Sequence, residues 1–127
     1  MFAQSRLQAI VLTSRLEQAE RFYRELLGLR VKRQSQAGVT FDVGGSDLLL
    51  GRVGSTKPSE HTIVGFAVPY LDAALAWLTS RGLSCVRFAG FPHAADGSVI
   101  APDGARVVWI RDPDGNLLSV VEFASQG

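Results

Sequence analysis

The segment QAIVLTSRLEQAERFYRELLGLRV, Gln8–Val31, decides the fold because its pattern recurs later in the chain. The segment IVGFAVPYLDAALAWLTSRGLSCV, Ile63–Val86, begins 55 positions after Gln8 and keeps the order of the apolar residues, with Phe22 answered by Trp77. An internal repeat of this kind indicates one supersecondary unit used twice. We therefore expect a pseudo-symmetric protein made of two similar halves.

The first copy predicts a strand, an amphipathic helix and three further strands. The strand covers residues 7–13, and the sequence SRLE after it is typical of a capping box in which Ser14 and Glu17 cap a helix start. Apolar residues recur at helical spacing up to Gly28, where a left-handed residue closes the helix. Three strands follow at residues 29–34, 38–43 and 47–53, the last two joined by a Gly-Gly-Ser turn.

The second copy predicts the same order of elements. Strands are expected at residues 62–68, 84–90, 105–111 and 116–123, a helix at 70–82, and a turn at the DPDG sequence of residues 112–115. Trp77 replaces Phe22 and is expected to pack against the back of the sheet. The stretch 91–104 is rich in Gly, Pro, Ala and Asp and predicts a long loop, a place where functional residues often lie.

Composition narrows the class of protein. Hydrophobic residues make up 46% of the chain and charged residues 20%, which is the balance of a globular protein. A net charge of +1 with no basic stripe argues against nucleic acid as a partner. No apolar run approaches the length of a membrane span, and the N-terminus lacks the pattern of a signal peptide, so we expect a cytoplasmic protein without a membrane partner. The single cysteine, Cys85, is expected to be a buried, inert thiol.

The segments LEQAERFYRELLGLRV and RDPDGNLLSVVEF, residues 16–31 and 111–123, resemble the vicinal oxygen chelate superfamily. This superfamily includes glyoxalase I, extradiol dioxygenases, fosfomycin-modifying enzymes and bleomycin-binding proteins. The resemblance covers nearly the whole chain and implies an α+β fold, in which two tandem βαβββ modules curl their sheets around a shared cavity with the helices outside. We expect one domain over residues 1–127, with module one at about 5–53, a linker at about 54–61 and module two at about 62–124.

In metal-dependent members of that superfamily four positions supply the metal ligands, and the resemblance places them at Gln8, Leu49, Ile63 and Ser119. Leu and Ile have no donor atom, whereas zinc needs about three or four N, S or O ligands. We therefore expect neither a metal nor another cofactor. A shifted site that uses Gln8 and His61 is the alternative, and we favour the interpretation of His61 as a surface residue at the end of the linker.

The alternation of residues along the strands predicts an apolar cavity in place of the metal. Its expected ligand-binding residues are Gln8, Ile10, Leu12, Phe41, Leu49, Ile63, Gly65, Trp109, Arg111 and Ser119. Trp109 lies ten positions before Ser119 and is either an aromatic platform for a ligand or part of the core. Arg111 either meets an anionic group or is solvated. His93, in the loop beside Phe91, either covers the cavity or lies exposed.

Two classes of function compete on these residues. The first is a metal-independent small-molecule binding protein, similar to bleomycin-binding proteins, which sequesters an amphipathic ligand. The second is a metal-independent lyase or isomerase in the same cavity, which requires a titratable group there. Metal-dependent glyoxalase or dioxygenase chemistry is a third. We favour binding, and we expect a homodimer because unpaired strand edges are usually covered by a partner.

Overall fold

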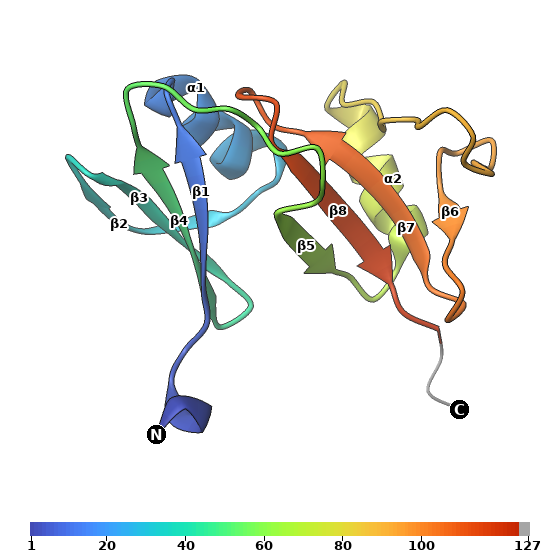
Figure 1. Ribbon diagram of the computed structural model, residues 1–127, viewed down its shortest axis with the longest axis horizontal. Helices are drawn as coiled ribbons and strands as arrows, with labels where there is room; N and C mark the ends of the chain where they lie inside the picture. The colour runs from blue at the N-terminus through green and yellow to red at the C-terminus, as the bar shows by residue number, and fades with distance from the viewer. Residues whose placement is uncertain (125–127) are drawn as a thin grey trace. The chain divides into compact units, whose positions relative to one another are not determined.

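The computed structural model in Figure 1 describes residues 1–124, and the chain within it divides into two compact units. Unit 1 consists of Met1–Pro58 together with the turn Asp112–Asn116, and unit 2 consists of Ser59–Arg111 and the chain from Leu117 onward. Each unit holds one four-stranded sheet and one helical segment, as the repeat predicts. No helix in the described part of the chain has the length and apolar character to cross a membrane.

The sheet of unit 1 has the strand order β1-β4-β3-β2, with β1 parallel to β4 and the other neighbours antiparallel. A 3-10 turn, Phe2–Gln4, precedes the sheet. The strands are β1 (Gln8–Thr13), β2 (Arg30–Ser35), β3 (Gly38–Val43) and β4 (Ser46–Arg52). Between β3 and β4 the residues Gly44 and Gly45 have φ angles of 55° and 89°. Two positive φ angles are what a tight hairpin of this type needs, so the Gly-Gly-Ser turn is confirmed.

A helical segment covers one face of this sheet. Helix α1 (Leu16–Arg21) continues as a π-helical turn, Phe22–Leu26, and Gly28 ends it with a φ angle of 77°. The buried ring of Tyr23 packs on Phe41 of β3, with ring centres 6.0 Å apart, above the buried side chains Val11, Leu48 and Leu50. The core of unit 1 therefore lies between the helical segment and the sheet.

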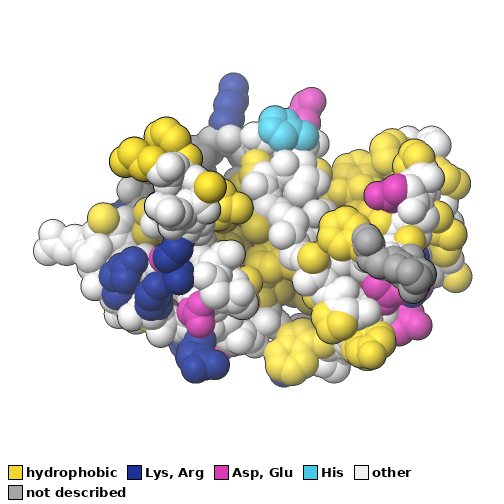
Figure 2. All heavy atoms as spheres, turned by 90° about the horizontal axis from the view of Figure 1, so that it is seen from below, with side chains coloured by type: hydrophobic (Ala, Val, Ile, Leu, Met, Phe, Trp, Pro, Cys, Tyr) yellow, Lys and Arg dark blue, Asp and Glu magenta, His cyan; other side chains and the backbone are white. Residues whose placement is uncertain are grey.

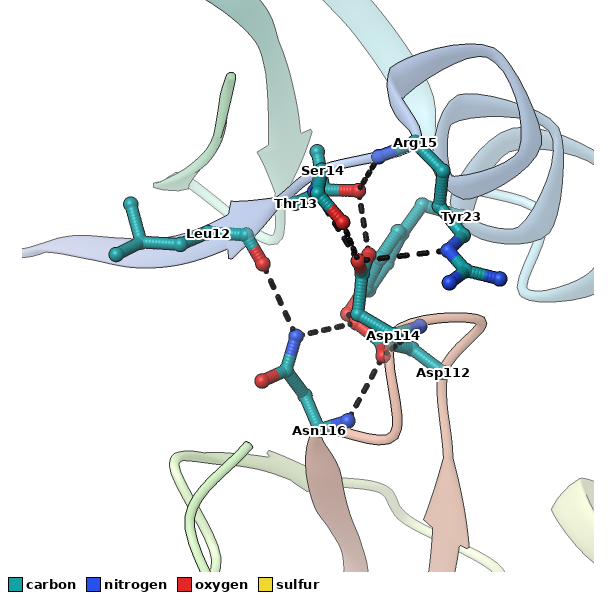
Figure 3. A network of polar contacts seen from close by, with 8 residues as sticks. All are labelled: Leu12, Thr13, Ser14, Arg15, Tyr23, Asp112, Asp114 and Asn116. Atoms are coloured by element: carbon teal, nitrogen blue, oxygen red, sulfur yellow. Dashed lines mark hydrogen bonds and ion pairs between the residues drawn. The ribbon is translucent and has the colours of Figure 1, made fainter. Parts of the chain in front are cut away.

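The predicted capping box is wrong. The hydroxyl and the backbone N–H of Ser14 both donate to Oδ1 of Asp114, which lies 100 positions later in the turn Asp112–Asn116 (Figure 3). The Thr13 hydroxyl donates to the other carboxylate oxygen of Asp114 and accepts from the N–H of Arg15. The N–H of Ser14, which was expected to donate to Glu17, thus donates to a distant carboxylate, and the Ser14 hydroxyl donates there and does not accept from the helix.

The second carboxylate of the same turn is buried in unit 1. Asp112 accepts hydrogen bonds from the Tyr23 hydroxyl at 2.7 Å, the Asn116 side chain at 2.9 Å, and the backbone N–H groups of Asp114 and Asn116 at 3.0 and 2.9 Å. Asn116 also donates to the carbonyl of Leu12 at 3.2 Å. Burial raises the pKa of the Tyr23 hydroxyl far above its ordinary value, and the charge of Asp112 raises it further. The turn is thereby attached to unit 1 by a fully hydrogen-bonded polar network.

The sheet of unit 2 has the order β5-β8-β7-β6, with β5 parallel to β8 and the other neighbours antiparallel. Its elements are β5 (Val64–Ala67), α2 (Leu71–Ser80), β6 (Val99–Ile100), β7 (Arg106–Arg111) and β8 (Leu117–Glu122). Leu71 of α2 packs on Val108 and Val120, so the core lies on the α2 face of the sheet. Glu122 points to that face and accepts the N–H of Leu71 at 2.7 Å, as an acidic group at a helix start should.

Two expectations for unit 2 are corrected. The segment 84–90 is not a strand, although Val86 donates its N–H to the Trp109 carbonyl at 2.7 Å, and the expected loop 91–104 contains the short strand β6.

Trp77 does not pack against the sheet as expected. It is 43% exposed with the Arg81 guanidinium 3.3 Å above its ring centre, whereas Leu71 and Leu78 fill the core. Helix α2 therefore buries Leu71 and Leu78 and leaves Trp77 on its outer side.

Candidate functional site

The open face of unit 2 is the side of its sheet that points away from α2. Strand register places Trp109 of β7 opposite Ser119 of β8, and Ser119 beside Gly65 of β5. These residues alternate with Val108 and Val120, which pack on α2, so they lie on the opposite face. Ile63 and Arg111 follow the same alternation. Strand pairing therefore puts Gly65, Trp109 and Ser119 on one face, with Ile63 just before β5 and Arg111 at the end of β7 in the same phase of the alternation.

Aromatic side chains form a wall on this face, which we call the aromatic wall: Phe88, Phe91, His93 and Trp109. The rings of Phe88, Phe91 and His93 stand at 77° to 87° to the Trp109 indole, with centres 5.3 to 6.2 Å away. Such edge-to-face contacts are favourable arrangements of aromatic rings. Trp109 is only partly buried and Phe91 is 51% exposed, so the wall is open to solvent and is not part of the buried core.

His93 holds the wall in place. Its Nδ1 lies 2.7 Å from the Gly97 carbonyl, and its Nε2 lies 2.9 Å from the backbone N of Phe88. Because the carbonyl can only accept and the N–H can only donate, the ring is neutral with its proton on Nδ1. His93 is partly buried and lies against Trp109 on the open face, whereas His61 is exposed. Sequence reasoning missed Phe88; its spacing to Phe91 and His93 in RFAGFPH is the only local signal.

The open face of unit 1 carries a second group of the expected residues. Gln8, Ile10 and Leu12 alternate with the buried Val11 and Thr13 on β1 and are exposed. Leu49 pairs with Ile10 and therefore shares their face. These four residues belong to unit 1, and the five described above belong to unit 2.

Phe41 does not lie on the open face of unit 1, contrary to the expectation from the sequence. Phe41 lies opposite Leu48 on the neighbouring strand, is fully buried and contacts Tyr23. It belongs to the face under the helical segment, because directly paired residues of adjacent strands point the same way. Thr40, opposite Leu49, occupies the open face instead.

A cluster of charges lies at one end of the same sheet. Asp47 is opposite Gln8, and its carboxylate accepts from Arg6 at 2.9 Å and from Lys32 at 3.0 Å, with Arg33 at 3.7 Å. The hydrogen bond from Lys32, with a further contribution from Arg6, holds the pKa of Asp47 below its usual value. Because its oxygens are already taken by these cations, Asp47 is a poor candidate for a metal ligand.

The positions where the resemblance implies metal ligands do not fit a metal. Gln8 and Leu49 of unit 1 offer one amide, and Ile63 and Ser119 of unit 2 offer one hydroxyl, while the hydrocarbon side chains offer no donor. Over residues 1–124, no three His, Cys, Asp or Glu side chains lie close enough together to hold an ion.

A separate cavity of about 460 Å³ lies in unit 2 between the end of α2 and residues 95–97. Leu75, Leu78 and Cys85 contribute to its lining. Burial raises the pKa of the Cys85 thiol, and the charge of Asp96 raises it further, which disfavours the reactive thiolate. The expectation of an inert cysteine agrees with this, although Cys85 is only partly buried.

The sequence profile of the Glyoxalase/Bleomycin resistance protein/Dioxygenase superfamily matches residues 6–120. The chain belongs to this superfamily. The tandem βαβββ fold and the two four-stranded mixed sheets agree with that membership, so the expected family and fold class are confirmed. No curated protein matches the chain closely enough to count as a relative.

Solved structures of the superfamily share the fold. A putative glyoxalase family protein from Bacillus anthracis is 20% identical with a TM-score of 0.75, over 95% of this chain and 96% of that one. A superfamily member from Sphaerobacter thermophilus is 26% identical with a TM-score of 0.75, over 96% and 99%. Lactoylglutathione lyase from Agrobacterium tumefaciens is 21% identical with a TM-score of 0.70, over 94% and 93%. At these identities the likeness concerns architecture.

Proposed function

We propose that this superfamily member binds a small amphipathic molecule without a metal, and that the open face of unit 2 is the main contact surface. The observation that carries the proposal is the partly exposed Trp109, which contacts three aromatic rings and shares its sheet face with the small residues Gly65 and Ala67. Sites for small molecules are mostly apolar, with a few polar groups that fix orientation. This face has that composition, with the Ser119 hydroxyl next to the indole.

Binding is favoured over catalysis by the state of the titratable groups nearby. His93 is the histidine of the aromatic wall, and both of its ring nitrogens are hydrogen-bonded to backbone groups. A general base needs a free lone pair within reach of the substrate proton. The neutral His93 ring offers none, so its role here is to position Phe88 and Phe91.

The test removes each tryptophan in turn. Binding of 2-acetylnaphthalene, a neutral aromatic probe, is measured by equilibrium dialysis for the wild type, Trp109→Ala and Trp77→Ala. Trp109→Ala should weaken binding by about 1–3 kcal/mol, the range for an aromatic contact that becomes desolvated. Trp77→Ala is the matched control, since Trp77 lies on the outer side of α2, and it should leave the affinity unchanged. Equal affinities for the two variants would refute the assignment.

We also propose that the protein is a homodimer in the cytoplasm. Support for the dimer comes from unit 1, where large apolar side chains reach the surface and β1 is an edge strand with one unpaired side. The most exposed are Met1, Phe2 and Leu7, at 99%, 85% and 82%, followed by Ile10 and Leu12. Figure 2 shows hydrophobic side chains at the surface in several places. Apolar surface next to an open strand edge is a liability that a second copy of the chain can cover.

A further inference from the structure

Gly65 brings the hydroxyl of Ser119 over strand β5. A Cβ atom at position 65 would lie 2.9 Å from Oγ of Ser119, which is shorter than a normal contact. The backbone of Gly65 does not itself require glycine, because its φ angle is not among the positive ones. The missing side chain at position 65 is therefore what allows the hydroxyl to take this place.

Two polar atoms on the open face of unit 2 are available to a ligand. Within residues 1–124, neither Oγ of Ser119 nor the indole N–H of Trp109 makes a side-chain hydrogen bond, although the backbone carbonyl of Trp109 accepts from Val86. All buried side-chain N and O atoms of that part do have partners, so these two atoms are open to solvent. Trp109 and Ser119 are directly opposite each other, and such residues have Cβ atoms about 4.5–5.5 Å apart, so both donors border the same part of the open face.

We infer that the ligand is a neutral aromatic compound with a carbonyl group, and that Ser119 and Trp109 bind its oxygen while Gly65 positions the Ser119 hydroxyl. This inference rests on the proposed function. The indole N–H can only donate, and a carbonyl oxygen has two lone pairs, so it can accept from the indole and from the hydroxyl together. The ring of the compound lies against the aromatic wall and the apolar residues Ala67, Val107 and Val121 of the same face.

The side chains around the two donors indicate that the ligand is neutral. A charged group loses several kcal/mol when it leaves water for an apolar face, unless a fixed opposite charge compensates it. The Ser119 hydroxyl and the Trp109 indole N–H are both neutral, and the one cation assigned to the same face, Arg111 at the end of β7, is exposed to water. A carbonyl oxygen needs no more than these two donors to replace its hydrogen bonds to water.

The experiment compares two probes of nearly the same shape, 2-acetylnaphthalene and 2-ethylnaphthalene, by equilibrium dialysis with the full chain. The wild type should bind the ketone about 5- to 30-fold more tightly than the hydrocarbon, the gain expected for two neutral hydrogen bonds. Ser119→Ala should reduce this preference several-fold, because one of the two donors to the carbonyl oxygen is lost. Gly65→Ala should do the same while Ser119 is still present, because the new methyl group forces the hydroxyl to turn away.

The double variant Gly65→Ala/Ser119→Ala decides whether Gly65 acts through Ser119. It should show the same ketone preference as Ser119→Ala alone, since no hydroxyl is left to displace. Additive losses would overturn the positioning role of Gly65. Equal wild-type affinity for both probes, with Trp109→Ala weakening both, would overturn the carbonyl inference and leave the proposed binding function standing. If neither probe binds the wild type, both the carbonyl inference and the proposed binding function are overturned. Thermal melting confirms that each variant is folded.

Discussion

The buried hydrogen bond from Tyr23 to Asp112 gives the sharpest test of how unit 1 is held together. Tyr23→Phe removes the hydroxyl that donates to the Asp112 carboxylate at 2.7 Å. Asp112 is only 5% exposed and keeps three other hydrogen-bond donors. A hydrogen bond to a charged group contributes about 1.5–3 kcal/mol. We therefore expect the free energy of unfolding to fall by that amount, and the melting temperature to fall by about 5–15 °C.

The measurement is urea unfolding followed by far-ultraviolet circular dichroism, with Tyr70→Phe as the matched control. Tyr70 is 72% exposed, so removal of its hydroxyl should change the free energy of unfolding by less than about 0.5 kcal/mol. Asp112→Ala leaves several buried donors without an acceptor and should cost about 4 kcal/mol or more. If Tyr23→Phe is no less stable than Tyr70→Phe, the network does not stabilise the fold as argued.

Four further outcomes are expected. Gly38→Ala should prevent folding or lower the free energy of unfolding by several kcal/mol, because its Cβ would lie 1.9 Å from the Leu50 carbonyl oxygen at a φ angle of 150°. Gly54→Ala, with open space around it, should leave that free energy nearly unchanged in the same urea titration. Asp47 has a lowered pKa in the folded state, so its ion pairs stabilise the protein above about pH 4 and are lost as the pH falls through that lower pKa. Below pH 4 the melting temperature of Asp47→Asn should therefore depend less steeply on pH than that of the wild type. The same slope for both proteins would contradict this. Light scattering at micromolar concentration should give about twice the chain mass of 13.7 kDa, and a monomer throughout would refute the dimer. Elemental analysis after purification without chelator should find no stoichiometric divalent ion, and added Zn²⁺, Ni²⁺, Mn²⁺ or Fe²⁺ should give neither glyoxalase nor catechol-cleaving activity; one tightly bound equivalent per chain would overturn the metal-independent proposal.

Local patterns in the sequence predicted the features that neighbouring residues decide. The repeat gave the order of strands and helices, and the paired glycines at 44 and 45 gave a tight turn that only positive φ angles allow. The short turn at 112–115 fixes the register of the strands on either side, so Ser119 was correctly placed opposite Trp109.

The tertiary structure decided what depends on residues far apart in the chain. Ser14 has the right neighbours for a local cap, yet its donors go to Asp114, and no pattern within one helix turn reveals an acceptor 100 positions away. Strand alternation shows which residues share a face, but it does not show which face a helix covers, and so Phe41 was assigned to the wrong side. The aromatic wall likewise exists only because a segment without strand structure folds over β7, where His93 bonds to backbone groups that a local pattern does not bring together.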